Sequence, residues 1–96
     1  MEDLLTKRKT EIATPKLFNV ILLNDDYTPM DFVMMVLAQV FRKTFDEAGA
    51  LTLGAHTNGK AIVGTYSRDM AETLTKKAED MAKEYEFPFR MGIEPA

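Results

Sequence analysis

The 96 residues include no cysteine, are 46% apolar and 28% charged, and carry a formal net charge of −3 with an isoelectric point near 5.1. These values predict one small domain of the reducing cytoplasm, exclude a disulfide framework and any cysteine-based metal or catalytic site, and argue against binding to nucleic-acid phosphates. No apolar run approaches the ~20 residues that span a bilayer, and a domain of this size favours a surface pocket over an enclosed active site.

The first part of the chain, residues 1–16, is charged and lacks the periodic apolar pattern of a helix or a strand. Thr14 and Pro15 interrupt it, and no apolar stretch marks a secretory signal. We expect a flexible tail over residues 1–16 and a folded core over residues 17–96. The core opens with Leu17–Leu23, a β-branched and apolar run that predicts a strand.

A first helix is predicted to follow this strand after a short polar turn. Thr28 offers an N-cap hydroxyl, Pro29 suits the first helical position, and Asp31 adds favourable charge near the helix start. Apolar side chains then recur at helical spacing, and we expect them in the core, at Val33, Val36, Leu37, Val40 and Phe41.

A second helix is predicted to begin at Thr44, because Thr44 followed three residues later by Glu47 has the pattern of a capping box. Asn58 and Gly59 supply left-handed conformers that would end it. A second strand is predicted over residues 60–66. The buried stripe of the second helix should comprise Ala48, Leu51, Thr52 and Ala55.

Ser67 is predicted to cap a third helix that stops near Pro88, and a short last strand is predicted over residues 89–93, although Gly92 weakens it. The exposed face of the third helix should carry the pairs Glu72–Lys76 and Glu79–Lys83. Its buried stripe should comprise Ala71, Leu74, Ala78, Met81 and Tyr85. The order β-α-α-β-α-β predicts a single α+β domain, a three-stranded antiparallel sheet with helices on one face.

Three acceptor-rich residues, Asn24, Asp25 and Asp26, stand where the first strand ends and the first helix begins. Asn and Asp are common turn residues that bond their own backbone, so a structural turn alone explains much of the pattern. Acceptors crowded beside a buried strand are nevertheless costly to desolvate. A ligand that donates hydrogen bonds or carries positive charge would relieve that cost, and we expect the free amino end of another polypeptide.

His56, the only histidine, lies near the predicted end of the second helix, where it is either structural or joins the carboxylates in receiving a cation. The spacing matches neither an EF-hand loop nor a helical histidine pair, so a metal-dependent enzyme is the weaker alternative. No second polar cluster supplies a nucleophile or an oxyanion site. We expect a protein that is not an enzyme and that needs no cofactor, with Met30, Met34 and Met35 beside an adaptable apolar pocket.

The string VILLNDDYTPMDFV at residues 20–33 resembles the signature of the ClpS adaptors. Residues 56–64 and 71–73 match as well, and the resemblance extends from Leu17 to the C-terminus. It implies an adaptor that binds substrates whose exposed N-terminal residue is Leu, Phe, Tyr or Trp. Such an adaptor hands them to a Clp protease through the N-terminal domain of a ClpA-like unfoldase.

The resemblance also implies roles for individual residues. Asn24, Asp25 and His56 would receive the α-ammonium group of the substrate, with Asp26 on the same polar rim. The pocket for the first side chain would be shaped by Thr28, Pro29, Met30 as its gate, Val33 and, near its edge, Phe89.

Two pocket positions depart from the family pattern, because Thr52 and Ala55 stand where a methionine and a valine are usual. Both side chains are shorter, and Thr52 is expected to bring a hydroxyl to the pocket wall. We expect the altered pocket to favour Phe and Tyr over Leu, since flat rings fill space that a branched chain cannot.

The expected ATPase-docking surface departs as well. Asp69 keeps a charge that would face the ATPase, whereas Leu74 replaces a lysine. Helical periodicity places Leu74 inside the fold, which conflicts with a docking position. A modulator that docks on the ATPase without efficient delivery is therefore the alternative to a delivering adaptor.

Overall fold

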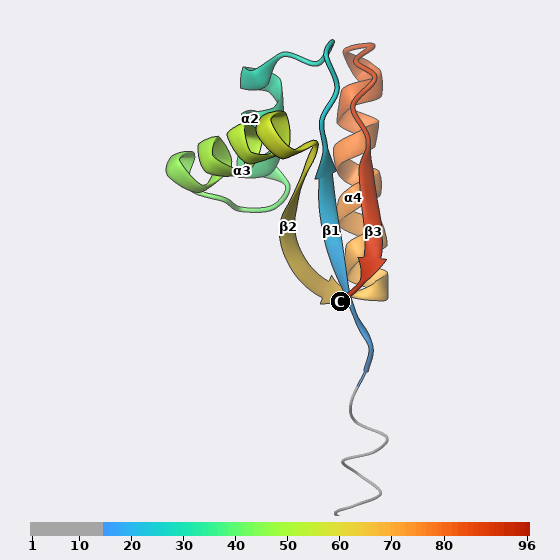
Figure 1. Ribbon diagram of the computed structural model, residues 1–96. Helices are drawn as coiled ribbons and strands as arrows, with labels where there is room; N and C mark the ends of the chain where they lie inside the picture. The colour runs from blue at the N-terminus through green and yellow to red at the C-terminus, as the bar shows by residue number, and fades with distance from the viewer. Residues whose placement is uncertain (1–14) are drawn as a thin grey trace, which may run out of the picture.

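A three-stranded antiparallel sheet and three helices make up the computed structural model, which describes residues 15–96 (Figure 1). All but the last two residues of the predicted tail lie outside the described residues. The order confirms the predicted β-α-α-β-α-β fold. The elements are β1 (Leu17–Leu23), α2 (Met30–Gln39), α3 (Phe45–Asn58), β2 (Lys60–Ser67), α4 (Arg68–Glu84) and β3 (Met91–Pro95).

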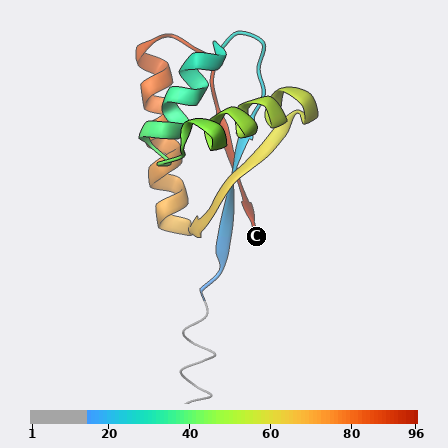
Figure 2. The same cartoon turned by 90° about the vertical axis from the view of Figure 1, so that its left-hand side faces the viewer.

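Strand β1 lies in the middle of the sheet and pairs antiparallel with β2 on one side and β3 on the other (Figure 1). Val20 and Leu22 lie two residues apart and therefore on one face of β1. Both join a buried cluster that includes side chains of α2, α3 and α4. The helices accordingly cover one face of the sheet, and Figure 2 shows them gathered on that side.

The start of α2 differs from the prediction. Thr28 does not cap the helix, because its hydroxyl donates to Asp25 instead. Pro29 is the N-cap residue, with an extended backbone at φ −61° and ψ 143°, and it makes no side-chain capping bond. The helix therefore begins at Met30, and the five predicted core positions that follow are all buried.

Helix α3 has the predicted capping box. The Thr44 hydroxyl accepts a hydrogen bond from the Glu47 N–H, and the Glu47 carboxylate accepts one from the Thr44 N–H. At the other end only Gly59 adopts the left-handed conformation, at φ 89°, while Asn58 remains the last helical residue. The predicted stripe faces inward, with Ala48, Thr52 and Ala55 buried and Leu51 half-buried.

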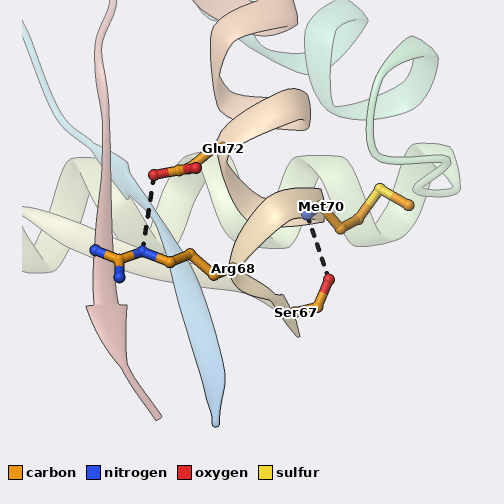
Figure 3. A network of polar contacts seen from close by, with 4 residues as sticks. All are labelled: Ser67, Arg68, Met70 and Glu72. Atoms are coloured by element: carbon orange, nitrogen blue, oxygen red, sulfur yellow. Dashed lines mark hydrogen bonds and ion pairs between the residues drawn. The ribbon is translucent and has the colours of Figure 1, made fainter. Parts of the chain in front are cut away.

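Helix α4 begins as predicted, with the Ser67 hydroxyl accepting a hydrogen bond from the Met70 N–H (Figure 3). Its buried face is rotated from the predicted one, because small side chains let the helix approach all three strands closely. Leu74 and Met81 are half-buried at the border, and Tyr85 is 57% exposed just beyond the helix end. The residues that face the sheet are Ala71, Thr75, Ala78 and Ala82.

The ion pairs on α4 also differ from the predicted ones. Glu72 pairs with Arg68 rather than with Lys76, at 3.8 Å (Figure 3). Lys76 pairs with Asp80. The predicted Glu79–Lys83 pair is absent from the described residues, because the Glu79 carboxylate accepts a hydrogen bond from the backbone N–H of Met91 at 3.0 Å and so joins α4 to β3.

The chain reverses between α4 and β3 around an aromatic cluster. Phe32 of α2 packs against Tyr85, Phe87 and Phe89, with ring centroids 5.2, 4.9 and 6.4 Å away. Glu86, between the first two, turns the chain with φ 59°. Because this cluster takes Phe89 into the core, strand pairing starts at Met91, two residues later than predicted.

Candidate functional site

A hollow of about 180 Å³ lies where the end of β1, the start of α2 and the last turns of α3 meet. It contains every predicted binding residue except Pro29 and Phe89, and Met34 and Met35, which were expected beside the pocket, line other depressions instead. Leu22 and Leu23 also line it and were missed by the sequence analysis, although they directly precede the polar turn. The lining residues are Leu22, Leu23, Asn24, Asp25, Asp26, Thr28, Met30, Val33, Thr52, Ala55 and His56.

The hollow is apolar inside and polar around its mouth. Val33, Thr52 and Ala55 are buried in its wall, whereas Met30 is 51% exposed at its edge. The exposed polar side chains of the turn and of His56 complete the rim. A cavity of roughly 150 Å³ is enough to hold a benzene ring, so this hollow has the size for one large apolar side chain.

The carboxylate of Asp25 is bound into its own turn. Its Oδ1 accepts hydrogen bonds from the N–H groups of Tyr27 and Thr28, at 2.9 and 2.7 Å, and its Oδ2 accepts one from the Thr28 hydroxyl at 2.9 Å. Burial would raise the pKa of Asp25, but these three donors outweigh it and hold the pKa below its ordinary 3.8. Asp25 is therefore an ionised residue that shapes the loop.

The neighbouring Asp26 differs in its bonding. It is exposed and lines the same hollow, and within residues 15–96 its carboxylate accepts no hydrogen bond and joins no ion pair. Both of its oxygens can therefore accept bonds from a ligand. The family resemblance implies Asp25 as a direct contact and Asp26 as a member of the rim; in the structure Asp25 is engaged within its own turn, whereas Asp26 is exposed on the rim.

A backbone hydrogen bond holds the two polar parts of the rim together. The N–H of Asn24 donates to the carbonyl oxygen of Gly59, at 3.0 Å. Gly59 ends α3, the helix that carries His56 in its last turn. The turn after β1 and the end of α3 are distant in sequence, and this bond fixes them side by side.

Thr52 presents a largely apolar surface to the hollow. Its hydroxyl donates to the carbonyl oxygen of Ala48 in the preceding turn of α3, at 2.7 Å. Thr52 lines the wall as expected, and its hydroxyl is already engaged within α3. The hydrogen bond is satisfied within the helix, so the position acts as a short, largely apolar wall.

Phe89 lies outside the hollow, 3% exposed, and lines a second depression on the other side of the polar turn. This depression shares Asp25 with the first one. Pro29 contributes by ending the turn, since its carbonyl accepts the N–H groups of Phe32 and Val33. Neither residue lines the hollow itself.

The two predicted docking residues have different surroundings. Asp69 is exposed in the first turn of α4. Leu74 is half-buried and packs against the edge of the core cluster, so it lies less deep than its helical periodicity indicated. Leu74 therefore offers only part of its side chain to a partner.

Over residues 15–96, no group of three or more His, Cys, Asp or Glu side chains is placed to hold a metal ion. None of the helices described there has the length and apolar character needed to cross a membrane.

Comparison with known proteins identifies close relatives. The model of the family "ATP-dependent Clp protease adaptor protein ClpS" matches residues 13–92. The ClpS adapter protein of Deinococcus radiodurans is 46% identical over an alignment that covers 94% of this chain and 80% of that protein. The protein ClpS 2 of Agrobacterium fabrum is also 46% identical, over 93% of this chain and 86% of its own length.

A solved structure is similar as well. Agrobacterium tumefaciens ClpS2, determined with bound L-phenylalaninamide, matches with a TM-score of 0.84 and 47% sequence identity. The match covers 86% of this chain and all of the other. At this level of identity the likeness extends beyond the fold to the family.

Proposed function

Because this chain belongs to the ClpS family of Clp protease adaptors, which are not enzymes, we propose that it binds the free N-terminal residue of polypeptides whose first side chain is large and apolar. The observation that carries this proposal is the apolar hollow with a carboxylate-rich rim, sized for one such side chain. The related ClpS2 binds L-phenylalaninamide, which has an α-ammonium group, a benzyl side chain and an amide where a chain would continue.

The ammonium group is the first element of recognition. It offers three donors, and its bonds to a carboxylate are charge-assisted and therefore strong. Asp26 has both carboxylate oxygens available, and Asn24 and His56 stand on the same rim. We assign the direct contacts to these three residues, while Asp25 contributes nearby negative charge and holds the loop in shape.

The side chain is the second element. Burying a large apolar side chain contributes about 1.5–3 kcal/mol. Val33, Thr52 and Ala55 form the pocket wall, and their side chains are short and buried. Since Thr52 keeps its hydroxyl bond within α3, the wall leaves room for a flat ring, and we propose that Phe and Tyr bind more tightly than Leu.

The two elements together give specificity for a chain terminus. Acetylation of the terminus removes the charge and most of the donors, and leaving polar groups of the rim unpaired costs about 1–3 kcal/mol. Neither an internal Phe nor a small N-terminal residue satisfies both parts of the site. The ligand is therefore defined as a free amino terminus that bears a bulky apolar group.

The membership in an adaptor family implies a Clp ATPase as the partner. We propose that the N-terminal domain of a ClpA-like unfoldase contacts the start of α4, where Asp69 is exposed and Leu74 is partly so. Location in the cytoplasm, where such a protease would act, stays a prediction that cell fractionation would check.

Fluorescence anisotropy with labelled peptides tests recognition. Peptides that begin with Phe, Tyr, Leu or Ala should bind in that order of affinity, and the acetylated Phe peptide should bind at least tenfold more weakly than the free one. Equal affinity for blocked and free termini would reject the proposed function.

A degradation assay with the Clp ATPase and its peptidase separates a delivering adaptor from a modulator. For a delivering adaptor, addition of the protein should accelerate turnover of a reporter that begins with Phe. A protein that binds the peptide, slows ATPase-dependent turnover of other substrates and leaves the reporter intact would instead be the modulator.

A further inference from the structure

The polar turn between β1 and α2 contains a closed pair of hydrogen bonds between two residues. The backbone N–H of Thr28 donates to one oxygen of the Asp25 carboxylate, at 2.7 Å, and the Thr28 hydroxyl donates to the other, at 2.9 Å. One residue thus satisfies both oxygens of the same carboxylate. No other hydrogen bond of the Thr28 hydroxyl occurs among residues 15–96.

We propose that Thr28 is a positioning residue of the site, whose hydroxyl keeps the Asp25 carboxylate ionised and fixed and so sets the turn on which the ammonium-binding rim is built. The expected effect of Thr28 on ligand binding rests on the proposed function. It goes beyond the expected role of Thr28 as part of the pocket wall. Thr28 is only 9% exposed, so its hydroxyl has little access to water as an alternative partner.

Within residues 15–96 the same carboxylate has no ionic partner that could replace this bond. Asp26 and His56 line the hollow with Asp25, and Glu79, Lys83 and Arg90 line the depression on its other side. Among the described residues, none of these five groups forms an ion pair or a hydrogen bond with Asp25. The charge of Asp25 is therefore held by donors within its own turn.

A protonated Asp25 would lose one acceptor site and weaken its bonds from the two backbone N–H groups. The turn would then relax, and with it the directions of Asn24 and Asp26, which flank Asp25 in the chain. Thr28 acts on the ligand through this geometry and makes no contact with the ammonium group itself. A positioning role of this kind predicts an effect on the pH range of binding.

Two substitutions separate the hydroxyl of Thr28 from its methyl group. Thr28→Val removes the donor and keeps a branched side chain in the pocket wall, and Thr28→Ser keeps the donor and removes the methyl group. Thr65→Val is the matched control, because Thr65 also donates its hydroxyl to a side-chain oxygen, that of Asn19, but on the sheet away from the site.

The primary measurement is the titration of the Asp25 carboxyl carbon by NMR in the free, full-length protein. In Thr28→Val its midpoint should move to higher pH, whereas Thr28→Ser and Thr65→Val should titrate as the wild type does. Peptide affinity near neutral pH should fall roughly threefold to tenfold in Thr28→Val, and its decline with acid should begin at a higher pH. An unchanged Asp25 titration in Thr28→Val would overturn the proposal.

If Thr28→Val does not fold, the comparison of Thr28→Ser with Thr28→Ala decides in its place, and identical Asp25 titrations in those two variants would overturn the proposal. The outcome for the proposed function is separate. If the wild type binds free and acetylated peptides equally, the proposed function fails, while the titration of Asp25 still judges the role of Thr28.

Discussion

The hydroxyl of Thr52 donates to the carbonyl oxygen of Ala48 at 2.7 Å, within one turn of α3. A threonine in the pocket wall therefore behaves as a short apolar residue. Its β-branch is stiff at χ1, and the bond holds that rotamer further. The width of the hollow at this point is thus set by a side chain with little freedom to adapt.

Substitution of Thr52 tests this arrangement. Thr52→Val should change the affinity for Phe-initiated and Leu-initiated peptides by less than about twofold, because the wall keeps its shape. Thr52→Met should narrow the hollow and reduce the preference for the Phe peptide over the Leu peptide. Fluorescence anisotropy measures both. Thr57→Val is the control, since Thr57 makes the same kind of bond, to Leu53, on the exposed side of α3.

The two adjacent carboxylates should respond differently to neutralisation. Asp26→Asn should reduce affinity for free-amino peptides about 10-fold to 100-fold with no change in melting temperature, because it removes a charged acceptor that supports nothing else. Asp25→Asn should destabilise the fold by about 1–2 kcal/mol, because it weakens three bonds of the turn. Calorimetry and anisotropy separate the two effects.

The opposite result for this pair is equally informative. If Asp25→Asn abolished binding at full stability while Asp26→Asn bound normally, Asp25 would be the direct contact, as the resemblance to the family first implied.

Met30 should control which first residues the pocket accepts. It is 51% exposed at the edge of the hollow, and a methionine adapts its shape to varied partners. Met30→Ala should weaken binding of the Phe peptide roughly tenfold. It should also reduce the difference in affinity between peptides that begin with Phe and peptides that begin with a smaller residue. Met70→Ala is the control, because Met70 is equally exposed, at 49%, on the first turn of α4. Unchanged selectivity in Met30→Ala would remove it as a gate.

Stability should depend on pH through the capping box of α3. Hydrogen bonds from the N–H and the hydroxyl of Thr44 hold the pKa of Glu47 below its ordinary 4.5. Because the pKa is lower in the folded state, ionised Glu47 stabilises the protein fully above about pH 4.5, and this stabilisation is lost as the pH falls through the folded-state pKa.

Urea unfolding at about pH 7 and about pH 3 checks this dependence. Glu47→Gln should lose less stability between the two conditions than the wild type does. Glu84→Gln, a change at an exposed residue outside every described hydrogen bond and ion pair, should match the wild type. A Glu47→Gln variant with the full wild-type pH dependence would contradict the assignment.

The features that the sequence predicted correctly are those set by local chemistry. The strand β1, the capping box at Thr44 and the cap at Ser67 all depend on residues close to one another in the chain. The apolar pattern of α2 identified its buried face for the same reason. The polar turn itself stood out because three acceptors follow one another at a strand end.

Two of the errors arise where one side chain had two possible partners. Thr28 was expected at the helix start, but Asp25 takes its hydroxyl. Glu79 was expected to form an ion pair along α4, but its carboxylate accepts a hydrogen bond from the Met91 N–H instead. Neither competition is visible in a pattern of residue types. The placement of His56 beside the turn depends on packing between distant segments, and only the folded chain provides it.

The hydrogen bond from the Asn24 N–H to the Gly59 carbonyl, at 3.0 Å, has a consequence for how a ligand enters. This bond joins the two parts of the rim before a ligand binds. Binding therefore does not have to order a flexible loop, and the loss of conformational entropy on binding is small. Deuterium uptake at the Asn24 amide should accordingly be slow in the free protein and should change little when the protein is saturated with peptide.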